Sequence, residues 1–176
     1  MKRMRSLLWF LIATILVFSL VDIGLTFENE PEGFRGMKWG DPPRPEMEFI
    51  TEMDEWTVVY RNPGDELRLG DARFDMIVYG FYASSDAPTR KLMSVDLYFR
   101  GEENFDILET ICKVKFGEPT NESYQYLGWA GLSSMVFLSY DSIDETGYLS
   151  LISMPISQQY NKEKEKKQAE EAEEDW

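Results

Sequence analysis

The chain has 176 residues, 43% of them hydrophobic, which suffices for one compact core and is too few for two ordinary domains. Its 18 basic and 32 acidic residues give a formal net charge of −14, which repels nucleic-acid phosphates, so we expect no nucleic-acid partner. Histidine is absent, which removes the commonest general base at neutral pH and the usual zinc ligand. We therefore expect a protein that is not an enzyme and carries no cofactor.

Residues 1–26 have the pattern of a signal peptide or a membrane anchor. Lys2, Arg3 and Arg5 precede an uncharged apolar run over residues 6–21. The basic flank favours a cytoplasmic start and export of the rest. We expect a hydrophobic helix that stays uncleaved and anchors the chain in the inner membrane, facing the periplasm. The alternative is cleavage, which would release a soluble periplasmic protein.

The predicted folded domain covers residues 34–157 and follows an acidic, proline-containing linker at residues 27–33. Its first segment, FRGMKWG at residues 34–40, predicts a strand with a packing Trp39. Pro45 then favours a short helix over residues 46–53, although the apolar stripe of that helix is thin.

Alternating apolar residues predict a series of strands after this point. The predicted strands cover residues 56–61, a segment through Leu67 and Leu69, and residues 76–83, 92–99, 123–127, 135–140 and 148–154. The sequence NPGD at residues 62–65 favours a type II turn. On residues 92–99 the alternation places Met93, Val95, Leu97 and Phe99 inward and Ser94, Asp96 and Tyr98 outward.

Residues 104–116 form the clearest predicted helix of the domain, because their apolar side chains recur at helical spacing and Gly117 and Pro119 end the pattern. We expect this helix to lie across the sheet. Cys112, the single cysteine, falls on its apolar face, which indicates a buried and inert thiol.

The pattern as a whole predicts an α+β fold. Its mostly antiparallel sheet has about six to eight strands and one main packing helix, with a hydrophobic helix before the domain and a charged helix at residues 158–176 after it. In this tail, Glu163 with Lys167 and Lys166 with Glu170 have i,i+4 spacing, which stabilises a helix. Two interpretations stay open for the tail: docking through a sparse stripe that includes the terminal Trp176, or a frayed end.

Four stretches of the sequence are notable together: FRGMKWG, YRNPGDELRLGDARFDMIVYGFY, the helix end KFGEP and the terminal DW. They resemble an uncharacterised family of small exported bacterial proteins with an F-x-G-x-x-W-G opening and a K-[FY]-G-x-P helix end. The resemblance spans residues 34–176 and implies one exported unit. It implies no activity and no catalytic residues. The helix end KFGEP also looks like that of small outer-membrane assembly lipoproteins, but their lipid-bearing cysteine is missing here.

Acidic residues invite two chemical interpretations, carboxylate catalysis and calcium binding. The pairs Asp71 with Asp75 and Asp141 with Asp144 have the side chains of a glycosidase. Such pairs are inevitable with 32 acidic residues, so they indicate a solvated surface. The loops GDELRLGD and DSIDETG are rich in oxygen ligands but lack the EF-hand spacing, so we predict no metal site.

Aromatic residues give large contact areas at low entropy cost, so they are the candidates for a binding surface. The candidate residues are Trp39, Tyr124, Tyr126, Trp129 and Trp176. Core packing is the competing interpretation, favoured for Trp39 and evenly balanced for Trp129.

The sequence therefore predicts a non-enzymatic protein of the cell envelope, membrane-tethered or periplasmic, that presents a protein-interaction surface. Its partners would be a protein in the envelope and, if the N-terminus stays uncleaved, the membrane through residues 6–21. The alternative is a soluble periplasmic binder of a small ligand or of calcium. That binder would use the aromatic loop at residues 124–129 or the acidic loop at residues 141–145.

Overall fold

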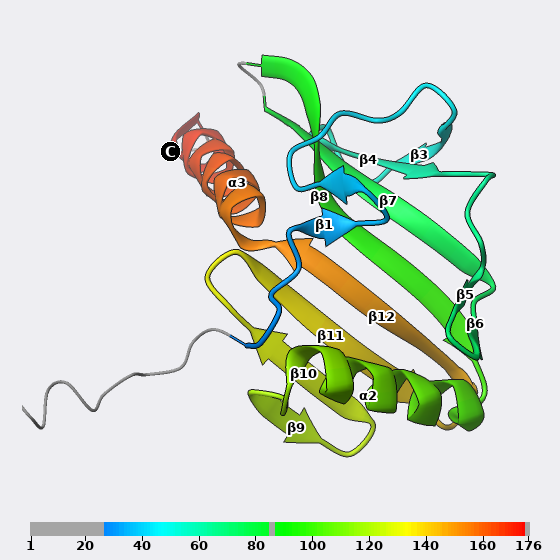
Figure 1. Ribbon diagram of the computed structural model, residues 1–176. Helices are drawn as coiled ribbons and strands as arrows, with labels where there is room; N and C mark the ends of the chain where they lie inside the picture. Colours follow the sequence, from blue (N-terminus) through cyan, green and yellow to red (C-terminus); the bar gives the residue numbers. More distant parts are fainter. Residues whose placement is uncertain (1–26, 85–86, 175–176) are drawn as a thin grey trace, which may run out of the picture.

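The computed structural model describes residues 27–84 and 87–174, which form an α+β fold with one large antiparallel sheet and two helices (Figure 1). This confirms the predicted fold class, the antiparallel sheet and the packing helix. The predicted hydrophobic helix at residues 6–21 lies outside the described residues.

Eight strands make up the large sheet. Their bounds are β3 (Glu48–Glu52), β4 (Thr57–Arg61), β7 (Met76–Ser84), β8 (Ala87–Arg100), β9 (Asn121–Ser123), β10 (Tyr126–Ala130), β11 (Ser134–Asp141) and β12 (Thr146–Ser153), in the spatial order β3-β4-β7-β8-β12-β11-β10-β9. Two small hairpins pair β1 (Gly33–Phe34) with β2 (Met37–Lys38) and β5 (Arg68–Leu69) with β6 (Ala72–Arg73). The helices are α2 (Glu102–Phe116) and α3 (Met154–Glu174).

The hydrophobic core lies on one face of the sheet, beneath α2, because alternate residues of each strand point to that face. The sheet contributes Ile77, Tyr79, Phe81, Leu92, Val95, Leu97, Phe99, Val136, Leu138, Leu149 and Leu151, and α2 contributes Phe105, Leu108, Cys112 and Phe116. Burial raises the pKa of the Cys112 thiol to about 12, so it is protonated at neutral pH. A buried, neutral thiol is what the apolar face of the helix predicts.

One position on β8 differs from the predicted alternation. The pairs Gly80↔Ser94 and Phe81↔Leu92 leave Met93 without a partner on β7, which is a β-bulge. Leu92 is therefore the fully buried residue, and Met93 is turned out of the core. The predicted inward position of Met93 is wrong because the alternation rule assumes an unbroken register.

The segment FRGMKWG forms a tight hairpin and not the single strand predicted for it. Gly33 pairs with Lys38 and Phe34 with Met37, so Arg35 and Gly36 make the turn. Both have positive φ, 48° and 75°, as the central residues of a type I′ hairpin turn do. The chain therefore reverses direction within the motif.

The helix predicted at residues 46–53 is also wrong, because this segment contains the edge strand β3. Phe49 pairs with Tyr60 of β4, and their rings meet edge to face at a centroid distance of 5.9 Å. Strand pairing with β4 stabilises this segment more than a helix with so few apolar residues on one face would.

Two turns also differ from their predictions. The turn at Asn62 has the expected hydrogen bond from the N–H of Asp65 to the carbonyl of Asn62, at 3.0 Å. Gly64 does not adopt the positive φ that a type II turn requires. The strand predicted at residues 123–127 is interrupted by a turn in which Gln125 has a φ of 56°, which separates β9 from β10.

Residues 27–33, expected as a linker with little to bury, lie against the domain. Phe27 is buried and meets Phe116 of α2 edge to face at 5.4 Å. The carboxylate of Glu30 accepts hydrogen bonds from the backbone N–H groups of Ser133 and Ser134, at 2.6 and 2.7 Å. These contacts fix the segment across the end of the sheet where α2 ends.

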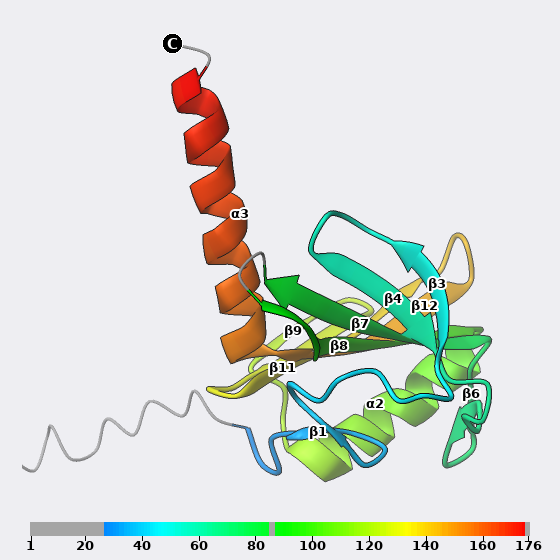
Figure 2. The same ribbon diagram turned by 90° about the horizontal axis from the view of Figure 1, so that it is seen from above.

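The charged tail is a helix, α3, that projects from the sheet on the side opposite α2 (Figure 2). Tyr160 fixes its first turns: its ring packs edge to face on Trp56 and Tyr82, and its hydroxyl donates to Asp54 at 2.6 Å. Lys167 extends this contact through an ion pair with Glu55.

Beyond Lys167, α3 leaves the body of the protein. Ala169 and Ala172 are exposed, and Trp176 lies outside the described residues. The predicted pair of Lys166 with Glu170 is present at 3.7 Å. The tail thus docks at its base only. Within residues 27–84 and 87–174, no helix combines the length and the apolar character needed to cross a bilayer.

We predict that Trp129→Ala lowers the free energy of unfolding by about 3–5 kcal/mol, the usual cost of removing a large buried aromatic. Trp129 is fully buried in β10, and its indole N–H donates to the carbonyl of Gly117 at 2.9 Å. Urea denaturation followed by circular dichroism measures the change. Tyr124→Ala is the control, because that side chain is 84% exposed, and should stay within about 0.5 kcal/mol of the parent. Equal effects would contradict the burial argument.

Candidate functional site

The face of the sheet opposite α2 is the candidate functional surface, and we call it the open face. In Figure 2, α2 and the β1–β2 hairpin lie on one side of the sheet, and the base of α3 stands on the other. The open face carries the outward residues of the central strands: Met76, Val78, Met93, Asp96, Tyr98, Tyr126, Phe137 and Tyr148. Apolar and aromatic side chains predominate, although 28% of the chain is charged.

A row of tyrosines crosses the open face from strand to strand. Met76 of β7 pairs with Tyr98 of β8, which pairs with Tyr148 of β12. Ser139 of β11 links Tyr148 to Tyr126 of β10. Met76, Tyr98 and Tyr148 are 40–42% exposed, so the row is open to a ligand or partner. Burial raises the pKa of Tyr98 and of Tyr126, so both hydroxyls are neutral donors near pH 7.

Two hollows lie along this face and share the side chains of Met76 and Tyr98. The first, the α3-end cavity, has a volume of about 490 Å³ and is bounded by β3, β4, β7, β8 and the base of α3. The second, of about 600 Å³, lies above the tyrosine row between Asp75 and Thr146. Hollows of this size are typical of sites for small molecules or for segments of a partner.

Asp96 is the only acidic residue among the outward residues of the open face given above, and it lines the α3-end cavity. It lies between Val78 of β7 and Ser150 of β12. Burial raises the pKa of Asp96, while a hydrogen bond from Ser150 acts in the opposite direction. No ion pair joins Asp96 to a Lys or Arg in the described part of the chain. Its charge therefore has no protein counter-ion there.

A second carboxylate, Asp54, stands at the wall of the same cavity and has a structural role. It accepts hydrogen bonds from the Tyr160 hydroxyl at 2.6 Å and from the N–H groups of Trp56 and Thr57 at 3.0 and 2.7 Å. Burial acts to raise the pKa of Asp54, but these hydrogen bonds outweigh it and lower the pKa. Asp54 thus stays ionised and holds α3 against the β3–β4 loop.

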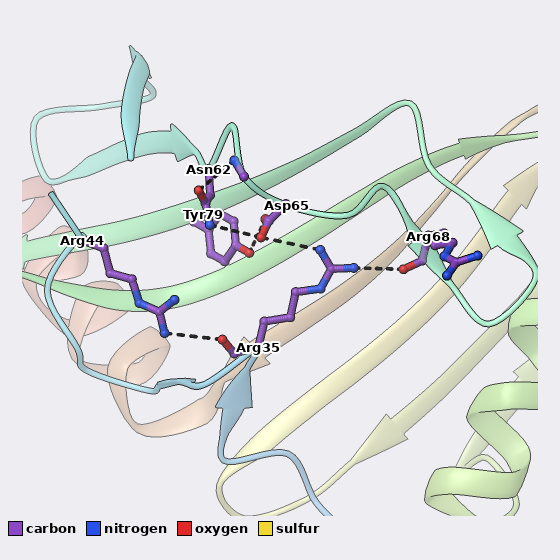
Figure 3. Close-up of polar contacts among 7 residues, drawn as sticks. Arg35, Arg44, Asn62, Asp65, Arg68 and Tyr79 are labelled. Atoms are coloured by element: carbon purple, nitrogen blue, oxygen red, sulfur yellow. Dashed lines mark hydrogen bonds and ion pairs between the residues drawn. The ribbon is translucent and has the colours of Figure 1, made fainter. Parts of the chain in front are cut away.

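A buried polar cluster on the α2 side of the sheet joins two of the sequence motifs, FRGMKWG and YRNPGDELRLGDARFDMIVYGFY (Figure 3). Arg35, from FRGMKWG, forms an ion pair with Asp65 at 3.5 Å and donates to the carbonyl of Arg68 at 2.9 Å. Asp65 also accepts from the hydroxyl of Tyr79 at 2.5 Å and from the amide of Asn62 at 3.1 Å. Burial, and then the bond to Asp65, raise the pKa of Tyr79.

These contacts give the motifs a structural role. The side chain of Asp65 is 7% exposed and has one cationic partner, Arg35, and two neutral donors, Tyr79 and Asn62. A buried ion pair of this kind fixes the position of the hairpin relative to the sheet.

Of the five residues predicted as a binding surface, the four that the structure describes are not brought together into one surface. Trp39 is half-buried and donates its indole N–H to the carbonyl of Pro31 at 2.7 Å. Trp129 is in the core, and Tyr124 is exposed at the β9–β10 turn. Of these four described residues, Tyr126 is the one on the open face, and Trp176 is outside the described residues. Sequence reasoning placed Asp96 and Tyr98 on an outward face but did not identify that face as a binding surface.

The acidic pairs and loops proposed for catalysis or calcium have ordinary structural contacts. Asp75 pairs with Arg100 at 2.8 Å. Asp141 accepts hydrogen bonds from the N–H groups of Ile143 and Asp144, which is a turn cap. Residues 27–84 and 87–174 contain no group of three or more acidic or cysteine side chains placed to hold a metal ion.

No protein-family model, curated protein or solved structure matches this chain. The function is therefore argued from the geometry of the open face.

We predict that Arg35→Ala costs about 2–4 kcal/mol of unfolding free energy, because it leaves the buried carboxylate of Asp65 without a cation. Arg61→Ala is the control. Arg61 pairs with Glu48 at 2.7 Å, but both side chains are more than half exposed, so its removal should cost less than about 1 kcal/mol. Urea denaturation at pH 7 compares the two variants. A larger loss for Arg61→Ala would refute the structural role assigned to the buried pair.

We also predict that Asp96→Asn raises the melting temperature at pH 7. The pKa of Asp96 is higher in the folded than in the unfolded chain, so ionisation costs folding free energy at every pH above the folded-state pKa. That cost shrinks as the pH falls and vanishes below the unfolded pKa of about 3.9, where both states are protonated. The gain in melting temperature from Asp96→Asn should therefore shrink between pH 7 and pH 3, and calorimetric scans measure it. Asp106→Asn, on the exposed side of α2, should show little such dependence.

Proposed function

We propose that the protein is a non-enzymatic component of the bacterial cell envelope that binds a protein partner through the open face. The observation that carries the proposal is the tyrosine row, which stays exposed on a face that no helix covers along most of its length within the described residues. Contiguous exposed apolar surface on a soluble domain marks an interaction site more often than chance.

The composition of the face supports a protein partner. Tyrosine and methionine are enriched in the buried centre of protein interfaces, and charged residues are depleted there. The open face has Tyr98, Tyr148 and Met76 on its central strands, and charged residues such as Arg100 and Asp141 border them at the strand ends. Apolar and aromatic residues bordered by charged ones are the usual arrangement of a docking surface.

The location in the envelope is proposed from the basic and apolar N-terminus. Lys2, Arg3, Arg5 and the run at residues 6–21 favour export, with an anchor in the inner membrane or, after cleavage, a soluble periplasmic form. In the anchored form the domain would present the open face to partners at the membrane surface.

Site-specific photocrosslinking in cells tests this proposal. A benzoylphenylalanine at Tyr148 should give one discrete crosslinked protein in the envelope fraction, because that side chain is 40% exposed in the centre of the face. The same group at Val114 of α2 is the matched control. Val114 is 81% exposed and lies on the helix that covers the other face, so it should give no such product.

A second substitution shows whether the crosslink depends on the face itself. Met76→Lys in the Tyr148 crosslinker chain places a charge in the row and should abolish the product, provided that circular dichroism shows an unchanged fold. A product of the same mass from both positions, or its survival in the Met76→Lys chain, would refute docking on the open face.

A further inference from the structure

We propose that the α3-end cavity binds a single-chain organic cation, an amphiphile whose alkyl chain lies among the methionines and whose ammonium group meets Asp96. This goes beyond the docking of a protein partner. It concerns the hollow between the β3–β4 hairpin and α3, and the tyrosine row that carries the proposed function lies mainly outside that hollow.

The lining of the cavity suits a flexible hydrocarbon chain. Three methionines contribute to it from three separate segments: Met53 follows β3, Met76 begins β7, and Met93 is turned outward by the bulge in β8. Val59 and Val78 complete the apolar floor. Methionine side chains are unbranched and polarisable, so they adapt to chains of variable shape. The volume of about 490 Å³ falls in the range of small-molecule sites.

The charge of the cavity selects a cation. Of the residues that line it, only Asp54 and Asp96 are charged, and both are acidic. The hydrogen bonds from Tyr160 and two backbone N–H groups occupy the oxygens of Asp54. Asp96 has no Lys or Arg partner in the described part of the chain, and an ammonium group beside it would supply the missing counter-ion.

Tyr98 gives the cation a second contact. Tyr98 lines the cavity and lies two residues after Asp96 on β8, so both side chains are on the same face of the strand. An ammonium group held between a carboxylate and an aromatic face gains both ion pairing and cation–π attraction. An anionic amphiphile of the same length would meet two carboxylates and no lining cation.

The test is a titration of the full-length chain with octylammonium, followed by the NMR signals of ¹³C-labelled methionine methyl groups. The signals of Met53, Met76 and Met93 should shift and saturate. Met37 and Met47 are buried away from the cavity and should not move, which makes them internal controls. Octanol and octanoate serve as the neutral and anionic probes of equal chain length.

The expected order of affinity is octylammonium, then octanol, then octanoate. Asp96→Asn should weaken octylammonium binding at least tenfold and leave octanol binding unchanged, while Asp106→Asn should alter neither. Equal affinity for the three probes, equal shifts at Met37 and Met47, or unchanged binding in Asp96→Asn would each overturn the proposal. Because the readout is local to the cavity, its failure leaves the crosslink at Tyr148 intact as a separate result.

Discussion

The structure depends on the coverage of an eight-stranded sheet by a single packed helix. α2 and the segments at the N-terminus bury one face, where the side chains of β7, β8, β11 and β12 meet Phe105, Leu108 and Phe116. Among residues 27–84 and 87–174, the base of α3 is the only helical segment that packs on the second face. A sheet with one covered face normally places polar residues on the other. Here tyrosine and methionine occupy much of that face, so apolar surface stays exposed in the folded domain.

The long elements of the fold could be predicted because their signals are local. The alternation of β7 and the helical spacing of α2 follow from side-chain geometry alone. The predictions fail where the structure of a segment depends on pairing with another segment that is distant in the sequence. β3 is a strand because β4 pairs with it, and Met93 leaves the core because of a bulge that only the register with β7 defines. The hairpin in FRGMKWG needs a left-handed Arg35, which no propensity scale would favour.

The candidate site was harder to predict than the fold. The sequence singled out aromatic residues as candidates, but Trp39 and Trp129 have their indole N–H groups bound to backbone carbonyls and serve packing. Asp96 and Tyr98 share a face of β8, but Tyr148 joins them only through the pairing of β12 with β8. The outward positions of Asp96 and Tyr98 on β8 were visible in the sequence, but the burial that raises the pKa of both groups depends on the folded structure.

The base of α3 is held by Tyr160 and Lys167, and this has a mechanical consequence. Twenty-one residues at about 1.5 Å each make a rod of roughly 31 Å, and the part beyond Lys167 stands clear of the body of the protein. Its successive i,i+4 ion pairs keep the rod straight without a hydrophobic partner. A stiff, charged helix at one border of the open face limits approach from that side, so a large partner reaches the tyrosine row most directly from the opposite strand ends, near Arg100 and Thr146.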